Sequence, residues 1–524
     1  MAADIAPGTE TIASVLIRQA RTRTTHPLLI CDAERLSYED AERRSALLAR
    51  GLITLGVGKG SHVGVLYPNG ADFVIGMLAT TRIGAVAVPF TTFATARELG
   101  EQLAHADVTV LLAARSYRSH DYVGRLTEAL GVREFTPSRP LFIARAPQLR
   151  HIVFDQHEVA NLADGVDDDL LCALQDDVDG SDPLAIVYTS GSTDVPKGAV
   201  HTHASVLGHQ RNLNEIRGLD ADDRLFCNSP FFWVGGLAFG LLATLVAGAT
   251  LVCSNAVDAG ATLDLLETER PTLTNGFAAA VAHLARHHSF PGRDLSSMRR
   301  GNLYPIMPAD VRPADPDRRH NMLGMTEAGG TFLLHADESD QPETRRGSFG
   351  RPAPGFETRV VDPDTGAAVE HGTVGELLIR GPHLMQRYHR RSREECFDPD
   401  GWFHTGDNVR VDEDGYVYYL GRRGAMIKTA GANVSPVEVE KAIARVTGGT
   451  VAHVVGLPDL ERGEIVAAVL VDHHVDPSAL RDLLAPELSA FKLPRRVATV
   501  TVTEVPLLSS GKVDLRRLRE VFDG

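Results

Sequence analysis

Hydrophobic and polar positions along the first third of the chain alternate in a rhythm typical of strands separated by helices. Short apolar runs occupy 63–68, 85–90 and 108–113, whereas in 38–56 apolar residues recur at helical spacing. Parallel strands need crossovers of this length, so the pattern predicts βαβ units around a parallel sheet. The same rhythm continues to about His335.

The pattern of predicted elements changes in the second half of the chain. Short strands and tight turns between Gly347 and Leu420 indicate a β-rich subdomain. After Gly421 come a helix at 436–446, strands at 452–458 and 465–472, another helix and a lysine-bearing tail. We therefore predict an α/β fold class: a large N-terminal domain, 1–420, of parallel-type sheets with helices and a β-rich subdomain, followed by a small α+β domain, 421–524.

One segment, Phe231 to Cys253, contains no charge over 23 residues, a length that is sufficient to span a bilayer. Four glycines interrupt it, no Lys or Arg flanks it, and its end is β-branched. These features favour a core helix that runs into a buried strand. A second unusual segment, rich in aspartate, lies between Asp164 and Asp182 and reads as a solvated linker.

Length, charge and cysteine content exclude several classes of protein. The chain has 524 residues, more than one hydrophobic core usually organises, so we expect at least two domains. Its formal net charge of -15 gives no long-range electrostatic attraction for nucleic acid. Its five cysteines form no CxxC pair, which argues against a disulfide framework or a zinc cluster. The N-terminal residues lack a signal-peptide pattern, and we expect a cytoplasmic protein without stable membrane insertion.

The strongest motif, YTSGSTDVPKG, follows the apolar run at 184–187 and covers Tyr188 to Gly198. Small hydroxyl residues and glycine at a strand end let backbone N–H groups approach phosphate oxygens, and Lys197 adds charge. The motif is not a Walker P-loop, because Pro196 precedes the lysine. It predicts a phosphate-binding loop rather than a Ser/Thr-rich surface loop.

With this motif the chain resembles the adenylate-forming superfamily of acyl-CoA synthetases, luciferases and peptide-synthetase adenylation domains. The resemblance extends over nearly the whole chain and continues in order through further motifs. These are Pro230–Gly236, Leu323–Glu327, Gly347–Pro352, Gly375–Leu377, Gly401–Asp407, Gly421–Arg422, Ile427–Lys428, Gly431, Pro436–Glu438 and Pro506–Lys512. Each motif is weak alone, and their common order makes the resemblance specific.

The resemblance implies that a carboxylate attacks the α-phosphate of ATP to give an acyl-adenylate, and that the thiol of coenzyme A then displaces AMP. It also implies a mobile C-terminal domain that swings about a hinge near Ala425. Catalytic roles are implied for Lys512, Lys197, Thr326 and Glu327, the last as a Mg²⁺ ligand. Roles in binding ATP, AMP or coenzyme A are implied for Thr189, Ser190, Gly191, Ser192, Thr193, Leu323, Asp407, Arg422, Lys428 and Gly431.

Four positions depart from the family pattern. Asp194 replaces a glycine of the phosphate loop, and a carboxylate ~4 Å from a phosphate costs ~4 kcal/mol at an effective dielectric constant near ~20. Leu323 replaces an aromatic residue that stacks on adenine, which loses about 1 kcal/mol. Ala425 replaces a polar hinge residue, and each ~1.4 kcal/mol shifts a domain equilibrium about tenfold. Trp233 stands where histidine is common and is either a gate or a core side chain.

The departures predict an acyl-CoA ligase whose adenylation step is weakened, so that thioester formation dominates. A partner adenylating enzyme would then supply acyl-adenylate. The alternatives are a fully competent two-step synthetase, a stand-alone enzyme that loads a carrier protein, and a non-catalytic adenylate-binding protein. For either ligase we expect a monomer or homodimer.

The acid is expected to be a largely apolar non-amino acid. Amino-acid-selecting relatives place an aspartate after an aromatic residue in the region of FFWVGG, and this chain has none there. The residues expected to border the acyl pocket are Trp233, Val234, Gly235, Gly236, Phe239 and Gly276.

Overall fold

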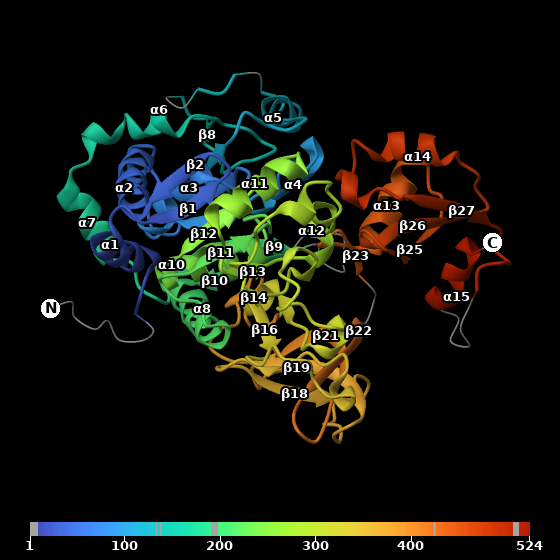
Figure 1. Cartoon of the computed structure of the whole chain (residues 1–524). Helices are drawn as coiled ribbons and strands as arrows, with labels where there is room; N and C mark the ends of the chain where they lie inside the picture. The colour runs from blue at the N-terminus through green and yellow to red at the C-terminus, as the bar shows by residue number, and fades with distance from the viewer. Residues whose placement is uncertain are drawn as a thin grey trace.

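The computed structural model describes residues 9–132, 134–136, 139–189, 197–422, 426–506 and 513–523. A seven-stranded sheet forms the centre of the N-terminal half (Figure 1). Its strands, in spatial order, are β20 (Arg387–Tyr388), β10 (Lys197–Thr202), β9 (Pro183–Thr189), β4 (Val86–Pro89), β3 (His62–Leu66), β5 (Val110–Ala113) and β8 (His151–Val153). From β9 to β8 the strands are parallel, whereas β10 and β20 pair antiparallel.

The predicted βαβ units are confirmed. The apolar runs at 85–90 and 108–113 contain β4 and β5, and the run at 63–68 overlaps β3, which starts one residue earlier. The intervening helices are α3 (Ala71–Thr81) and α4 (Ala96–His105), and α2 (Tyr38–Thr54) precedes β3. Thr95 caps α4: its side chain accepts from the amide of Glu98, and the Glu98 carboxylate accepts the amide of Thr95 in return. This capping box fixes the start of α4.

A second, six-stranded sheet packs in the same body. Its strands, in spatial order, are β14 (Arg300–Gly301), β13 (Leu273–Asn275), β11 (Arg224–Cys227), β12 (Thr250–Cys253), β1 (Pro27–Cys31) and β2 (Glu34–Ser37). All are parallel to their neighbours except β2. Helix α8 (His203–Arg217) leads into this sheet, and its last residue, Arg217, precedes a left-handed Gly218.

The uncharged segment 231–253 is mostly buried, as predicted, with 233–235 and 246–247 partly exposed. It forms α9 (Val234–Gly236), the π-helical segment η2 (Leu237–Leu242), α10 (Ala243–Ala247) and then β12. All six residues of η2 are buried. Among the described residues, no helix combines the length and the apolar character that crossing a bilayer requires.

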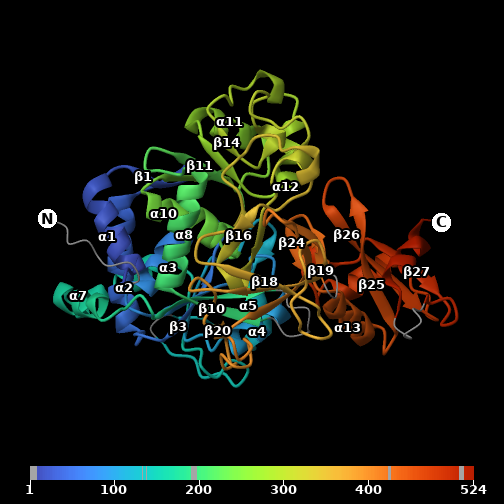
Figure 2. The same cartoon turned by 90° about the horizontal axis from the view of Figure 1, so that it is seen from below.

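The segment from 347 to 422 is β-rich, as expected. An antiparallel sheet contains, in spatial order, β18 (Glu357–Val361), β19 (Val374–Arg380), β21 (Phe403–Val411) and β22 (Val417–Arg422). A small sheet contains β15 (Leu323–Met325), β16 (Gly330–Leu334) and β17 (Arg351–Pro352). In Figure 1, β16 lies between β19 and β14 of the six-stranded sheet, and in Figure 2 the β-rich layer is seen from below, with α2 at the opposite end of the molecule from the last strands of the chain.

The last part of the chain forms a five-stranded sheet with helices on both faces. Its strands are β24 (Ala432–Val434), β23 (Ile427–Thr429), β26 (Gly463–Val471), β25 (Ala452–Asp459) and β27 (Arg496–Val500), which pairs with β26. Helices α13 (Pro436–Val446) and α14 (Pro477–Leu484) cover one face, and α15 (Leu515–Arg519) covers the other. Figure 1 shows this unit beside α4 and α12 (Ala278–Ala285) of the larger body.

Candidate active site

A buried carboxylate lies where three segments of the chain meet. Glu327 sits in the 3-10 turn Thr326–Ala328 directly after β15 and is only 6% exposed. The hydroxyl of Tyr388, in β20, donates to its Oε1 over 2.6 Å. The ammonium of Lys197, the first residue of β10, lies 5.4 Å from the centre of the Tyr388 ring. The fold thus brings together a carboxylate, a phenol and a lysine that are distant in sequence.

Two of the contacts that position Glu327 and Thr326 involve residues that the sequence motifs do not single out. Besides Tyr388, His201 contacts the backbone carbonyl of Thr326 through Nε2 at 2.7 Å. Burial lowers the pKa of His201 to about 4, so this imidazole is neutral near pH 7 and its Nε2–H donates to the carbonyl. A neutral donor holds the Thr326 backbone without adding charge beside Glu327.

The phosphate-loop residues are only partly described. Thr189 ends β9 and pairs in register with Lys197 of β10, so the two ends of the loop are adjacent. Ser190, Gly191, Ser192, Thr193 and Asp194 lie outside the described residues, as do the hinge position Ala425 and the tail residue Lys512.

The predicted nucleotide residues of the β-rich layer also take positions on strands. Asp407 is 5% exposed in β21, and its register partner on β22 is Arg422. Leu323, in β15, is buried in the apolar cluster that contains Phe332 and Leu333. The predicted nucleotide residues thus come from the ends of several different sheets.

On the C-terminal unit, Gly431 faces the larger body. It has φ +85°, and a Cβ added there would lie 2.7 Å from the ring of Phe277, the residue that precedes α12. Lys428, on β23, has its ammonium 5.0 Å from the centre of the Tyr419 ring. The face that carries Lys428 and Gly431 is therefore turned toward the N-terminal body.

The aromatic residues at the junction form a chain between the two units. The Trp233 ring lies 5.3 Å from that of Phe232 and 6.4 Å from that of Phe93. Phe93 in turn contacts Phe491 of the C-terminal unit, with ring centres 5.8 Å apart. Trp233 therefore stands next to the junction of the two units.

A cluster of charges joins the two units beside these rings. The Lys492 ammonium lies 2.6 Å from Glu98 of α4 and 2.7 Å from Glu438 of α13, and the Ser489 hydroxyl donates to Glu98 over 2.6 Å. Burial opposes both charges, but attraction outweighs it: the pKa of Glu98 is lowered and the pKa of Lys492 is raised. Arg97 and Arg445 both contact Glu487 nearby. We call Glu98, Glu438, Ser489 and Lys492 the junction cluster.

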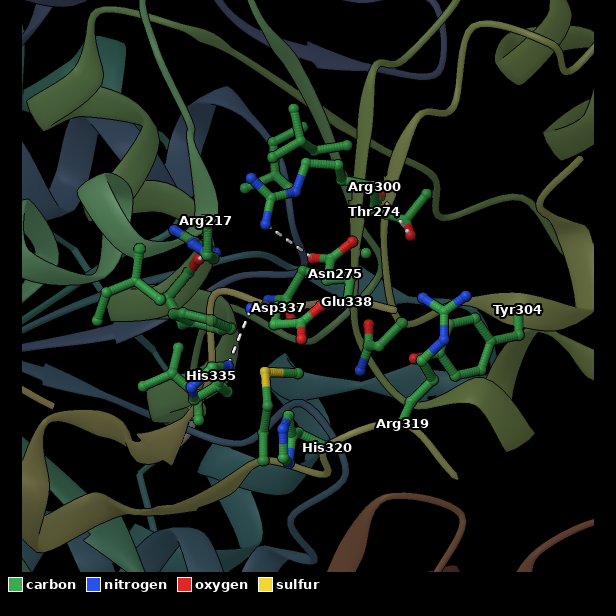
Figure 3. A pocket seen from close by; sticks show the side chains of 18 residues that line it. Arg217, Thr274, Asn275, Arg300, Tyr304, Arg319, His320, His335, Asp337 and Glu338 are labelled. Carbon is green, nitrogen blue, oxygen red and sulfur yellow. Dashed lines mark hydrogen bonds and ion pairs between the residues drawn. The ribbon is translucent and has the colours of Figure 1, made fainter. Parts of the chain in front are cut away.

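A cavity of about 60 Å³ lies between α8, β13, β14 and the ends of β15 and β16 (Figure 3). Of the six residues expected to border the acyl pocket, Phe239 lines this cavity, whereas Trp233, Val234, Gly235, Gly236 and Gly276 do not. Met322 lines it and immediately precedes Leu323, so β15 connects the cavity to Thr326 and Glu327. Further lining residues include Arg217, Asn275, Arg300, His320 and His335.

The side chains near Glu327 could hold a magnesium ion only together with oxygen atoms from a bound substrate. Among the described residues, no group of three or more His, Cys, Asp or Glu side chains is placed to hold a metal. Glu327 contributes one buried carboxylate, and Mg²⁺ is commonly bound by one or two carboxylates together with substrate phosphates. Glu327 with ATP fits that pattern.

Comparison with known proteins agrees with this geometry. The sequence pattern of AMP-binding enzymes matches residues 16–389, and that of the AMP-binding enzyme C-terminal domain matches 438–512. The chain is 32% identical over 497 residues to a feruloyl-CoA synthase of an Amycolatopsis species, covering 93% of this chain and 94% of the relative. It is 29% identical to 4-coumarate–CoA ligase 1 of rice (Oryza sativa subsp. japonica), covering 93% and 87%.

Solved structures give the same fold. An ATP-bound MatB from Rhodopseudomonas palustris has a TM-score of 0.64 at 25% identity and covers 97% of this chain and 99% of its own. An o-succinylbenzoate CoA synthetase from Bacillus subtilis has a TM-score of 0.77 at 22% identity and covers 97% and 98%. The chain therefore belongs to the AMP-binding enzyme family and, within the adenylate-forming superfamily, is an AMP-forming acid–thiol ligase of the acyl-CoA ligase type.

Proposed function

We propose that this acyl-CoA ligase carries out thioester formation more effectively than adenylation. In the first step a carboxylate oxygen bonds to the α-phosphorus of ATP and pyrophosphate leaves. In the second step the sulfur of coenzyme A bonds to the acyl carbon, AMP leaves with the bonding electron pair, and the thiol proton passes to solvent. Lys197, Thr326 and Glu327 would act on the phosphates, and bound Mg²⁺ would neutralise their charge.

The observation that carries this proposal is the contact between Gly431 and Phe277. It turns the Lys428–Gly431 face toward the body that holds Thr326 and Glu327, and the turn approaches the Phe277 ring so closely that only a residue without a Cβ fits there. Helix α15, which follows the tail, packs on the opposite face of the C-terminal sheet from α13. This arrangement is the one expected while the thiol reacts.

Weak adenylation is inferred from three residues. Leu323 is buried, and it would give adenine an aliphatic contact instead of an aromatic ring. Asp194 would repel a triphosphate more than an adenylate monoester, and Ala425 would supply no polar contact to the hinge. In cells, a separate adenylating enzyme would then supply part of the acyl-adenylate.

Two assays on the purified chain test the proposal. Exchange of labelled pyrophosphate into ATP, with a panel of carboxylic acids, measures the first step. Thioester formation from supplied acyl-adenylate and coenzyme A measures the second. We expect the second rate to exceed the first by about tenfold or more, which corresponds to ~1.4 kcal/mol. Equal rates would instead establish a fully competent two-step synthetase. Transfer of the acyl group to a carrier protein but not to coenzyme A would show that the carrier protein is the acceptor.

The acid would have an apolar body. Phe239 and Leu334 supply apolar wall to the cavity, and the cavity is small enough to favour a compact acid over a long alkyl chain. Thioester formation with short and aryl acids, compared with long-chain acids in the same assay, tests this size limit.

A further inference from the structure

An arginine lines the cavity without a carboxylate partner. Arg217 is the last residue of α8; its Nη1 donates to the Phe239 carbonyl over 3.2 Å and its Nη2 to Asn214 Oδ1 over 2.9 Å. Its Nε is buried and has no hydrogen-bond partner among the described residues. No described carboxylate forms an ion pair with it. Burial lowers the pKa of Arg217 to about 9, which leaves it charged near pH 7.

The other charges around the cavity are already engaged. Arg300 pairs with Glu338 at 3.3 Å, and Arg319 pairs with Asp340 at 2.7 Å. Both carboxylate oxygens of Asp337 accept hydrogen bonds within its own loop, from the Ser339 amide and the Gln341 side chain. Figure 3 shows Arg217 on the opposite side of the cavity from Arg319. Arg217, whose guanidinium carbon lies 3.9 Å from the centre of the Phe239 ring, is therefore the cation of this lining that has no carboxylate partner in the described part of the chain.

Two histidines of the same wall are neutral and polar. Burial lowers the pKa of His320 to about 4 and also lowers the pKa of His335. His335 Nδ1 accepts the Asp337 amide, and His320 Nε2 is buried without a partner in the described residues. The lining thus combines two neutral imidazoles with a guanidinium that has no carboxylate partner among the described residues, and an entirely apolar ligand would leave that charge unpaired at a large cost.

We propose that Arg217 binds a second anionic group at the far end of the acyl substrate, so that the preferred acid is a dicarboxylic acid with a short apolar body. A guanidinium that lacks a protein carboxylate binds a carboxylate of the ligand with two parallel hydrogen bonds and excludes a neutral end group of the same size. This inference rests on the proposed function, because it assigns the cavity to the acyl chain.

The test compares acids that differ only in the charge of the far end. With the full chain, ATP, Mg²⁺ and coenzyme A, kcat/KM for thioester formation is measured for succinate, glutarate, adipate and suberate and for the monoamide of each. We expect the best diacid to exceed its monoamide by about tenfold or more. Arg217→Met should reduce that ratio at least about tenfold, and Arg217→Lys should retain part of it. Arg270→Met, at an exposed ion pair with Asp294, should leave the ratio unchanged.

A binding measurement separates this inference from the proposed function. Acyl-sulfamoyl adenosines of adipate and of its monoamide are titrated into the wild type and Arg217→Met by calorimetry, with thermal unfolding as the folding control. Tighter binding of the diacid derivative that Arg217→Met abolishes supports the inference even if no thioester forms. Equal binding and equal kcat/KM for diacid and monoamide in the wild type would overturn it, whereas thioester formation from monoacids would leave the ligase activity intact.

Discussion

At the scale of single residues, the hydrogen bond from Tyr388 to Glu327 has a measurable consequence. Tyr388→Phe removes a 2.6 Å bond to a buried carboxylate, and a bond to a charged group contributes about 1.5–3 kcal/mol. We expect pyrophosphate exchange to fall about tenfold or more, with a smaller loss in thioester formation from supplied adenylate. Tyr418→Phe, which removes a 3.0 Å bond to Asp412, should affect neither rate. Equal losses in both half-reactions would contradict a role confined to the phosphates.

The same cluster shows what a motif can and cannot predict. Thr326, Glu327 and Lys197 were predicted because each stands in a short run whose order is characteristic. Tyr388 and His201 had no such signal, because they reach Glu327 and Thr326 only through the pairing of β20 with β10 and the fold around it. Local sequence carries no record of contacts that long-range strand pairing creates. The structure brings Thr326, Glu327 and Lys197 close together, but their roles, like those of Lys512 and Asp194, stay predictions.

At the scale of elements, the contact between the β23–β24 turn and Phe277 predicts a specific defect. In Gly431→Ala the new Cβ would lie 2.7 Å from the Phe277 ring, so the two units must separate slightly. Thioester formation should fall more than about tenfold. Gly463→Ala is the matched control, because its φ of +76° carries the same backbone cost of about 1–2 kcal/mol and its nearest atom lies at 3.4 Å.

A second variant decides whether the clash is the cause. Adding Phe277→Ala to Gly431→Ala removes the ring that the new methyl group meets, and should restore part of the thioester rate. If the double variant is no faster, backbone strain at Gly431 alone explains the loss, and the contact has no role in docking. Rates of thioester formation for the wild type, Gly431→Ala, Gly463→Ala and the double variant give the answer.

Elements also differ in how far their sequence predicts them. The β3, β4 and β5 strands were predicted because their apolar runs are bounded and continuous. The aspartate-rich segment 164–182, read as a linker, instead contains helix α7 (Asp168–Asp176). Asp167 caps it by accepting the Leu170 amide, Asp168 and Asp169 lie in its first turn, and Leu171 is buried. The many aspartates made the segment look like a solvated linker, although some of them cap a helix that Leu171 packs against the core.

At the scale of the whole molecule, the junction cluster should make the arrangement of the two units insensitive to pH over a wide range. The pKa of Glu98 is lowered from 4.5, so the stability that its charge gives to the junction is fully present above pH 4.5 and is lost as the pH falls further. The pKa of Lys492 is raised from 10.5, so the stability that its charge gives to the junction is lost only above pH 10.5. The other charged groups in contact are Glu438, Arg97, Glu487 and Arg445, and no described histidine is among them. X-ray scattering curves should therefore superimpose between about pH 5 and 10.

Weakening the junction cluster without changing its shape should redistribute the two half-reactions. Glu98→Gln keeps the volume and an acceptor for Ser489 but removes the charge opposite Lys492, at a cost of about 1.5 kcal/mol. A free-energy change of that size shifts the orientation equilibrium about tenfold. Thioester formation from supplied adenylate should fall by about that factor, while pyrophosphate exchange holds or rises, because the released domain visits the other orientation more often.

The matched control lies at the same junction. Glu461→Gln alters the exposed pair of Glu461 with Arg286, 3.0 Å apart, and exposed pairs contribute at most about 1 kcal/mol. It should leave both rates nearly unchanged. A parallel fall of both half-reactions in Glu98→Gln would mean that Glu98 serves only the folding of α4, whose N-terminal capping box it completes, whereas opposite changes require two functional orientations in exchange. The ratio of the two rates, rather than either rate alone, therefore reports the orientation.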